Sequence, residues 1–200
     1  MKLLEGNDLF EEIYNVKNDV LNHKRTLTDT QKLIIAIKCC QMLIQLHKKG
    51  VIHRDIKPAN IFICNAADSK KPQVKILDFG ISKLVGAGAK AQQLTAVGEI
   101  FGSPFYMSPE QCRGDMVDAR SDIYSVGCSL FEALTGFVPF EGKTSLDISL
   151  LHEEAEPPLI CDVDESLAAD LPDSVDAVIA KCLAKQPEER YQSADELASD

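Results

Sequence analysis

Polar side chains interrupt an apolar stretch at residues 51–63, VIHRDIKPANIFI. Asp55 is followed by Lys57 and Asn60 in the same stretch, and Asp78 comes later in the sequence LDFG. A carboxylate can orient an acceptor hydroxyl and take its proton, a lysine can neutralise a phosphate, and carboxylate and amide oxygens suit Mg²⁺. These residue types match what phosphoryl transfer requires, which is positioning and electrostatic stabilisation of dense negative charge.

A long helix is expected just before this cluster, starting at about Thr28. Thr28 and Gln31 form a T-x-x-Q capping box, and the interior LIIAIKCCQMLIQL is apolar nearly all round. Gly50 stands where a C′ glycine belongs. We expect a helix this hydrophobic to be central, with the polar cluster in the loop that follows it.

Two short β-type runs follow the cluster, at residues 60–64 and 73–77, with a polar turn between them. The pattern predicts a small hairpin. Its two strands could return Asp78 beside Asn60 and so place two metal ligands together. Gly80 permits the backbone turn that a following loop needs.

Most of the remaining chain has the pattern of helices. A turn predicted at Gly6-Asn7 leads into a short amphipathic helix with Leu9, Ile13 and Val16 on one stripe. Further helices are expected at 121–134 (ended by Thr135-Gly136), 144–154 and 173–184, and a long mobile loop at the Gly-, Ala- and Gln-rich residues 83–102. The predicted fold class is mainly α with a small β-hairpin.

The bulk composition excludes several classes of protein. The 200 residues are 45% apolar, enough to bury one core, and their net charge of −10 argues against binding nucleic acid or anionic lipid through a broad basic face. Seven cysteines without a C-x-x-C pair predict small buried thiols in a reducing cytosol rather than a disulfide framework or a zinc site. No apolar run approaches the roughly 20 residues that span a bilayer. We therefore expect a cytoplasmic location without a transmembrane segment.

Three motifs occur in order along the chain: HRDIKPAN at residues 53–60, DFG at residues 78–80 and SPE at residues 108–110. Together they resemble the catalytic-loop, magnesium and activation-segment signatures of protein kinases. A lone HRD would be a weak signal, but all three in this order and spacing are very unlikely to agree by chance. Small-molecule kinases of the aminoglycoside or choline type share an H-x-D-x-x-x-x-N pattern but lack the K-P pair and the SPE segment, so they rank well behind.

The resemblance implies a role for each polar residue of the cluster. Asp55 would be the catalytic base and Lys57 would contact the γ-phosphate of ATP. Asn60 and Asp78 would bind Mg²⁺, and Arg54 would face a phosphorylated loop residue. ATP and Mg²⁺ are the implied cofactors, and protein substrates are the implied partners.

The resemblance extends to residues that would support the site. Asp122 in SDIYSVG resembles the aspartate of the family's central helix, which braces the backbone of the catalytic loop. Arg190 resembles the late arginine that pairs with the glutamate at Glu110. Phe62 falls where the family places the apolar floor under adenine. His53 is expected to be structural, packing in the core beside Phe79.

Lys57 also indicates the substrate class, because serine/threonine members carry a lysine two residues after the base. Ser103 stands where those members place a serine or threonine that hydrogen-bonds the base and this lysine. The phrases MSPEQCRG and ARSDIYSVG look most like bacterial, eukaryotic-like (Hanks-type) serine/threonine kinases. Thr95 lies on the implied activation segment, where a phosphorylation site and an ordinary loop threonine are about equally favoured.

The resemblance covers only a C-terminal lobe. It implies a partial kinase domain over residues 1–200, with a hinge at about 1–7, the lobe at about 8–200 and an activation segment at 78–110. Leu4 would offer its backbone N–H to adenine, and Asp8 would lie near the ribose. A glycine-rich loop and a strand lysine are expected to be missing with the N-terminal lobe, and both chain ends look cut rather than finished. We therefore expect weak ATP binding and little kinase activity from this chain alone.

One alternative function stays open: a catalytically silent, kinase-like lobe that binds partner proteins through its late helices. The complete set of Asp55, Lys57, Asn60 and Asp78 favours the enzyme. The missing lobe favours the binding module for this particular chain.

Overall fold

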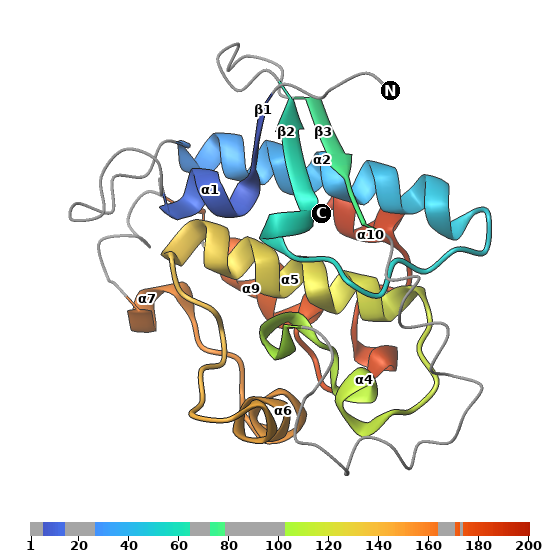
Figure 1. The fold of residues 1–200 in the computed structure, drawn as a ribbon, viewed down its shortest axis with the longest axis vertical. Coiled ribbons are helices and arrows are strands. Elements are labelled where there is room, and N and C mark those ends of the chain that lie inside the picture. The colour runs from blue at the N-terminus through green and yellow to red at the C-terminus, as the bar shows by residue number, and fades with distance from the viewer. Residues whose placement is uncertain (1–5, 15–26, 65–72, 79–102, 164–170, 173) are drawn as a thin grey trace.

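The computed structural model describes residues 6–14, 27–64, 73–78, 103–163, 171–172 and 174–200. These residues form a helical body with one small sheet (Figure 1), so the predicted fold class is confirmed. The expected mobile loop at 83–102, together with Val16, Phe79 and Gly80, lies outside the described residues. No helix among the described segments is both long and apolar enough to cross a membrane.

Two long helices form the centre of the fold. Helix α2 (Asp29–His47) begins at the predicted capping box, in which the Gln31 N–H donates to Thr28 Oγ1 at 3.3 Å and the Thr28 N–H donates to Gln31 Oε1 at 2.7 Å. It ends at Lys48, and Gly50 adopts a left-handed φ of 71° shortly afterwards. Helix α5 (Ala119–Thr135) is buried from Ser121 to Thr135 and ends at Gly136, as expected. The two helices lie side by side (Figure 1).

The sheet has three antiparallel strands in the order β1 (Gly6–Asp8), β2 (Ile61–Cys64) and β3 (Gln73–Ile76). β2 and β3 are the predicted hairpin, and it covers one side of α2. The predicted turn at Gly6-Asn7 is wrong, because these residues belong to the strand β1, which pairs antiparallel with β2 and has Gly6 opposite Cys64. A Cβ at Gly6 would lie only 2.0 Å from the Ile63 carbonyl oxygen, so the glycine serves close strand approach instead of a turn.

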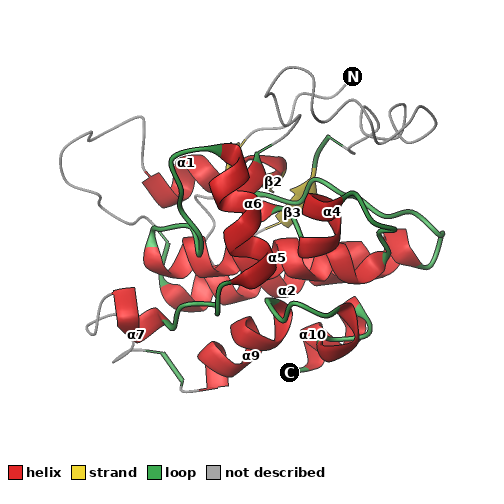
Figure 2. Cartoon of the chain, turned by 90° about the horizontal axis from the view of Figure 1, so that it is seen from below, coloured by secondary structure: helices red, strands yellow, loops and turns green. Residues whose placement is uncertain are grey.

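Shorter helices surround the central pair. The amphipathic helix α1 (Leu9–Tyr14) packs beside the sheet, and Figure 2 shows the late helices from below. The predicted helices at 144–154 and 173–184 are confirmed as α6 and α9. The bounds of the remaining helices are α4 (Pro109–Arg113), α6 (Ser145–Glu154), α7 (Ile160–Val163), α9 (Ser174–Cys182), α10 (Ala194–Ser199) and the 3₁₀ turns η1 (Pro58–Asn60), η3 (Pro104–Tyr106) and η4 (Pro187–Glu189).

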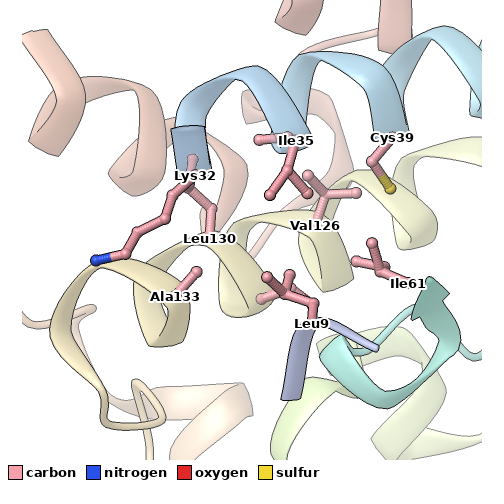
Figure 3. A pocket seen from close by; sticks show the side chains of 10 residues that line it. Leu9, Lys32, Ile35, Cys39, Ile61, Val126, Leu130 and Ala133 are labelled. Carbon is pink, nitrogen blue, oxygen red and sulfur yellow. The ribbon is translucent and has the colours of Figure 1, made fainter. Parts of the chain in front are cut away.

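One apolar core joins α1, α2, α5 and the sheet. Figure 3 shows Leu9, Ile35, Val126 and Ile61, which come from these four elements, lining one small cavity. The volume of this cavity is about 10 Å³. A second core lies between α5, α7 and α9. Both cores include residues of α5, so this helix is the packed support for the polar loop at residues 51–60.

Helices α5 and α9 approach closely where Gly127 faces Cys182. A Cβ added at Gly127 would lie 2.6 Å from the Cβ of Cys182, so only glycine allows this approach of the two helices. All seven cysteines are free thiols, and five of them are buried, as expected for small core thiols.

Candidate active site

The polar loop between α2 and β2 is anchored by two buried side chains. The Asp122 carboxylate, at the start of α5, accepts hydrogen bonds from the backbone N–H groups of His53 at 2.9 Å and Arg54 at 2.8 Å. The His47 Nε2 lies 2.8 Å from the same carboxylate. The His53 ring is buried, with its Nε2 3.1 Å from the Leu77 carbonyl oxygen, which fits the expected structural role. These contacts tie the loop to α5 and to the end of β3.

Arg54 adopts an unusual backbone conformation, with φ at 66°. A non-glycine residue in this left-handed region is strained and persists only where its surroundings hold it. Here the strain directly precedes Asp55. The loop is therefore held in a conformation that its own sequence does not favour.

Two polar side chains of the loop, those of Lys57 and Asn60, meet at Asp55. The Lys57 Nζ lies 3.1 Å from Asp55 Oδ2. The Asn60 Nδ2 donates to the Asp55 carbonyl oxygen at 2.8 Å and to Asp55 Oδ2 at 3.0 Å. The side chains of Asp55 and Lys57 keep 19% and 24% of their surface exposed, so a ligand can reach them. The structure thus brings together three of the residues predicted from spacing.

Asp78 is the fourth predicted residue, and the hairpin returns it toward the loop. The Leu77 N–H donates to the Asn60 carbonyl oxygen at 2.8 Å, which places Asp78 one residue beyond this bridge. Asp78 itself has a φ of 51°.

The donor set of Asn60 and Asp78 fits Mg²⁺. Because the Asn60 amide nitrogen makes both donations to Asp55, its oxygen remains the atom suited to a metal. One amide oxygen and one carboxylate are hard ligands, of the kind that hold Mg²⁺ together with phosphate oxygens.

A family model of the protein kinase domain matches residues 3–200. The chain belongs to the protein kinase family. The predicted resemblance is therefore confirmed over nearly all of the sequence.

Curated relatives of this kinase are bacterial serine/threonine enzymes. The chain is 41% identical over 182 residues to the serine/threonine-protein kinase PknB of Mycobacterium tuberculosis, covering 91% of this chain and 27% of that protein. It is 37% identical over 200 residues to the probable serine/threonine-protein kinase CE0033 of Corynebacterium efficiens, covering all of this chain and 28% of that protein. The chain thus spans about a quarter of the length of these relatives, which agree with the predicted bacterial Hanks-type resemblance.

The kinase SPE segment is fixed by a buried ion pair. Arg190 Nη1 and Nη2 each donate to one carboxylate oxygen of Glu110 at 2.8 Å, and the Arg190 side chain is fully buried. Ser121 Oγ donates to Glu110 Oε1 at 2.6 Å. Burial opposes ionisation of Glu110, but the hydrogen bonds from Arg190 and Ser121 outweigh it and lower the pKa to about 2. The predicted pairing of Glu110 with Arg190 is therefore present in the fold.

The remaining predicted residues lie in different parts of the kinase. Phe62 is half-buried in β2, opposite Asp8 in β1, so the expected adenine and ribose contacts are neighbours. Asp8 also caps α1, since its Oδ1 accepts from the Glu11 N–H at 2.8 Å. Ser103 is half-buried just before η3. Leu4 and Thr95 lie outside the described residues.

Sequence reasoning missed a buried carboxylate in the last turns of α5. Glu132 is 1% exposed and accepts hydrogen bonds from Tyr14 Oη at 2.7 Å and Tyr106 Oη at 2.6 Å. Burial raises the pKa of Glu132, while the two phenol hydrogen bonds act in the opposite direction. The carboxylate links α1 to η3, which leads into the SPE segment.

A buried imidazole beneath η3 was also missed. His152 in α6 is fully buried, and its Nδ1 lies 2.8 Å from Tyr124 Oη. Its Nε2 has no hydrogen-bond partner among the described residues. Burial and the nearby Lys185 ammonium lower the His152 pKa to about 4, so the ring is neutral at pH 7. A polar residue on the buried face of an apolar helix is the signal that could have revealed Glu132 and His152.

Proposed function

We propose that this chain carries the catalytic part of a serine/threonine protein kinase that transfers the γ-phosphate of ATP to protein hydroxyls. The convergence of Lys57 and Asn60 on Asp55 is the observation that carries the proposal. A silent lobe has no need to hold a phosphate-binding lysine and a metal ligand each within hydrogen-bond distance of a base. The family membership supports the same reaction class.

The proposed chemistry divides among four residues. Asp55 orients the acceptor hydroxyl and takes its proton. Lys57 offers a positive charge to the transferring phosphate, next to the base. Asn60 and Asp78 would hold Mg²⁺, which when bound neutralises charge on the phosphate oxygens.

The protein substrate is proposed to offer serine or threonine. Lys57, two residues after the base, is the residue that supports this class, and the curated relatives are named as serine/threonine kinases. Phe62 and Asp8, neighbours across β1 and β2, are proposed to face adenine and ribose. Leu4 and Thr95 keep their proposed roles in adenine contact and phosphorylation from the sequence alone.

We further propose that residues 8–200 act as the C-terminal lobe, after a hinge at about 1–7, with an activation segment at 78–110. A nucleotide held mainly by this lobe has its phosphates poorly positioned. Misplacing a reacting group by about 1 Å can cost about 10²-fold in rate. The chain by itself is therefore expected to bind ATP weakly and to transfer phosphate slowly, if at all.

The proposal is tested with the purified 200-residue chain. Calorimetry is expected to show weak ATP binding that requires Mg²⁺ and falls about tenfold or more, about 1.4 kcal/mol, in Asp78→Asn. Transfer of labelled phosphate to casein is expected to stay close to the level of the matched Asp55→Asn variant. ATP binding that is equal in EDTA and in Asp78→Asn contradicts the proposed nucleotide site. Clear transfer that Asp55→Asn abolishes supports the kinase assignment but contradicts the expected weakness of the chain alone.

A protein-binding module is the second candidate, and helix α6 favours it. Leu146 and Leu150 lie one turn apart on α6 and are 65% and 46% exposed. Exposed apolar side chains on one helix face are typical of a docking surface. A partner whose binding depends on these two leucines and is indifferent to Asp55→Asn, combined with no Mg²⁺-dependent ATP binding, would favour the module.

A further inference from the structure

Gln111 connects the SPE segment to the catalytic loop. It is the third residue of α4 and directly follows Glu110. Its Oε1 accepts a hydrogen bond from the Ser108 N–H at 3.0 Å, which is the helix-capping half of its role. Its Nε2 donates to the Arg54 carbonyl oxygen at 3.1 Å, a contact that spans 57 residues of sequence.

The two partners determine the orientation of the Gln111 amide. A backbone N–H can only donate and a backbone carbonyl can only accept, so the Oε1 must face Ser108 and the Nε2 must face Arg54. A carboxylate at this position could satisfy Ser108 but has no proton for Arg54 at neutral pH. Glutamine is therefore able to serve both partners at once.

The contact lies at the strained residue of the loop. Arg54 has a φ of 66°, its N–H is held by Asp122 Oδ1 at 2.8 Å, and its carbonyl is held by Gln111. Strained backbone persists only where several contacts over-determine it. The carbonyl that accepts from Gln111 belongs to the peptide group that joins Arg54 to Asp55.

We propose that Gln111 is a positioning residue. By holding the Arg54 carbonyl, it keeps Arg54 in its left-handed conformation and so sets the direction of the Asp55 side chain. The role in phosphoryl transfer rests on the proposed function. Since α4 is itself fixed by the buried pair of Glu110 and Arg190, the geometry at Asp55 depends on how α4 is docked. A displacement of α4 withdraws the amide from Arg54 and relaxes the loop.

The simpler role for Gln111 is capping of α4 through Ser108. Two substitutions separate the roles. Gln111→Glu keeps an acceptor for the Ser108 N–H and removes the donor to Arg54. Gln111→Met has a similar length and removes both. Gln41→Glu, at an exposed position on α2, is the matched control for one added negative charge.

The experiment is NMR spectroscopy of the 200-residue chain at neutral pH. In Gln111→Glu, the Arg54 carbonyl carbon and the Asp55 amide are expected to shift, and the Arg54 N–H to exchange about fivefold faster, the factor of one typical net hydrogen bond. Amides inside α2 and α5 are expected to exchange at the wild-type rate. Gln111→Met is expected to reproduce the loop changes and to lower the unfolding midpoint as well, and Gln41→Glu to leave the loop unchanged.

Unchanged Arg54 and Asp55 signals in Gln111→Glu would overturn the inference, because capping alone predicts that result. Uniformly faster exchange through α2 and α5 would overturn it too, since it reports lost stability and not a released loop. The measurements need no nucleotide. A released loop in a chain that does not bind Mg²⁺ and ATP keeps this inference and overturns the proposed function, whereas Mg²⁺-dependent ATP binding with an unmoved loop does the reverse.

Discussion

Helix α5 carries a buried carboxylate near each end, and the two are held by different donors. Asp122 accepts from two backbone N–H groups of the catalytic loop and lies 2.8 Å from the His47 imidazole. Glu132 accepts from the phenols of Tyr14 and Tyr106. Both side chains are almost completely buried, so each stays in place only because its partners replace water.

The difference shows how one helix supports a rigid contact and an adjustable one. Asp122 lies in the first turn, where the helix dipole favours a negative charge, and its backbone donors cannot leave without moving the loop. Glu132 lies near the other end, where the dipole disfavours a carboxylate, and burial raises its pKa. Asp122 therefore fixes the loop that carries Asp55, while Glu132 links α1 and η3 through two phenol hydroxyls, whose O–H groups can turn without moving the backbone.

The comparison is most strongly tested at Asp122. Asp122→Ala leaves two backbone donors and His47 without their acceptor, and each buried orphan costs about 1–3 kcal/mol. We expect the free energy of unfolding to fall by about 5 kcal/mol, or the chain not to fold. Urea denaturation measures the loss, with Asp195→Ala, an exposed carboxylate in the first turn of α10, as the control. A loss below about 1 kcal/mol would mean that the loop does not depend on this anchor.

A third buried carboxylate, Glu110, extends the comparison because its partner is an arginine. Arg190→Met removes that partner and leaves the buried Glu110 carboxylate without its countercharge, although Ser121 Oγ still donates to it. Breaking such a pair costs about 3 kcal/mol or more, which thermal and urea unfolding can measure. The double variant with Glu110→Leu is expected to recover part of the loss, since apolar replacements of buried pairs are often tolerated. No recovery would indicate that the destabilisation comes from lost packing around Arg190.

Glu110 and Glu132 are expected to change the free energy of unfolding in opposite directions as the pH falls. The folded-state pKa of Glu110, about 2, is below its ordinary value of 4.5, so its contribution is present above pH 4.5 and is lost as the pH falls toward 2. After allowance for solvent screening, this loss amounts to about 2 kcal/mol. Glu132 has a raised pKa, so its contribution is fully present at acid pH and is lost as the pH rises.

Unfolding free energies between pH 5 and pH 2 test this sign. Glu110→Gln is expected to flatten the acid decline, and Glu132→Gln to steepen it. Parallel pH profiles for the two variants would refute the opposite signs.

The smallest effect is expected for the adjustable link. Tyr14→Phe removes one of the two phenol donors to Glu132 and leaves the ring in place, which costs about 1 kcal/mol. Tyr106→Phe, on the other side of the same carboxylate, is the matched comparison. The free energies of unfolding measure both. If either change cost as much as Asp122→Ala, the distinction between a rigid and an adjustable contact would fail.

Local sequence patterns predicted the elements that depend on neighbouring residues. The capping box of Thr28 and Gln31, the hairpin of β2 and β3 and the end of α5 at Gly136 are each set within a few residues of chain. The strand β1 was predicted as a turn because its partner, Cys64 opposite Gly6, lies far along the sequence. A glycine in the sequence is compatible both with a turn and with a close approach of two strands. Only the position of the partner strand distinguishes the two.

The candidate site was predicted in part for the same reason. Motif spacing identified Asp55, Lys57 and Asn60, and the family resemblance identified Asp122 and the Glu110–Arg190 pair. The links of Glu132 and His152 were missed because they join residues that no short motif contains. Their chemistry comes from burial and from partners on other helices, neither of which a linear pattern expresses.

The buried thiols can report when the helices that carry them separate. Burial raises the pKa of Cys39 and Cys40 in α2, of Cys128 in α5 and of Cys182 in α9. Because the thiolate is the form that alkylating reagents attack, these groups react only when their helices separate. The partly exposed Cys161 in α7 supplies the surface rate for comparison. Mass-spectrometric labelling can therefore time the separation of each central helix without any engineered probe.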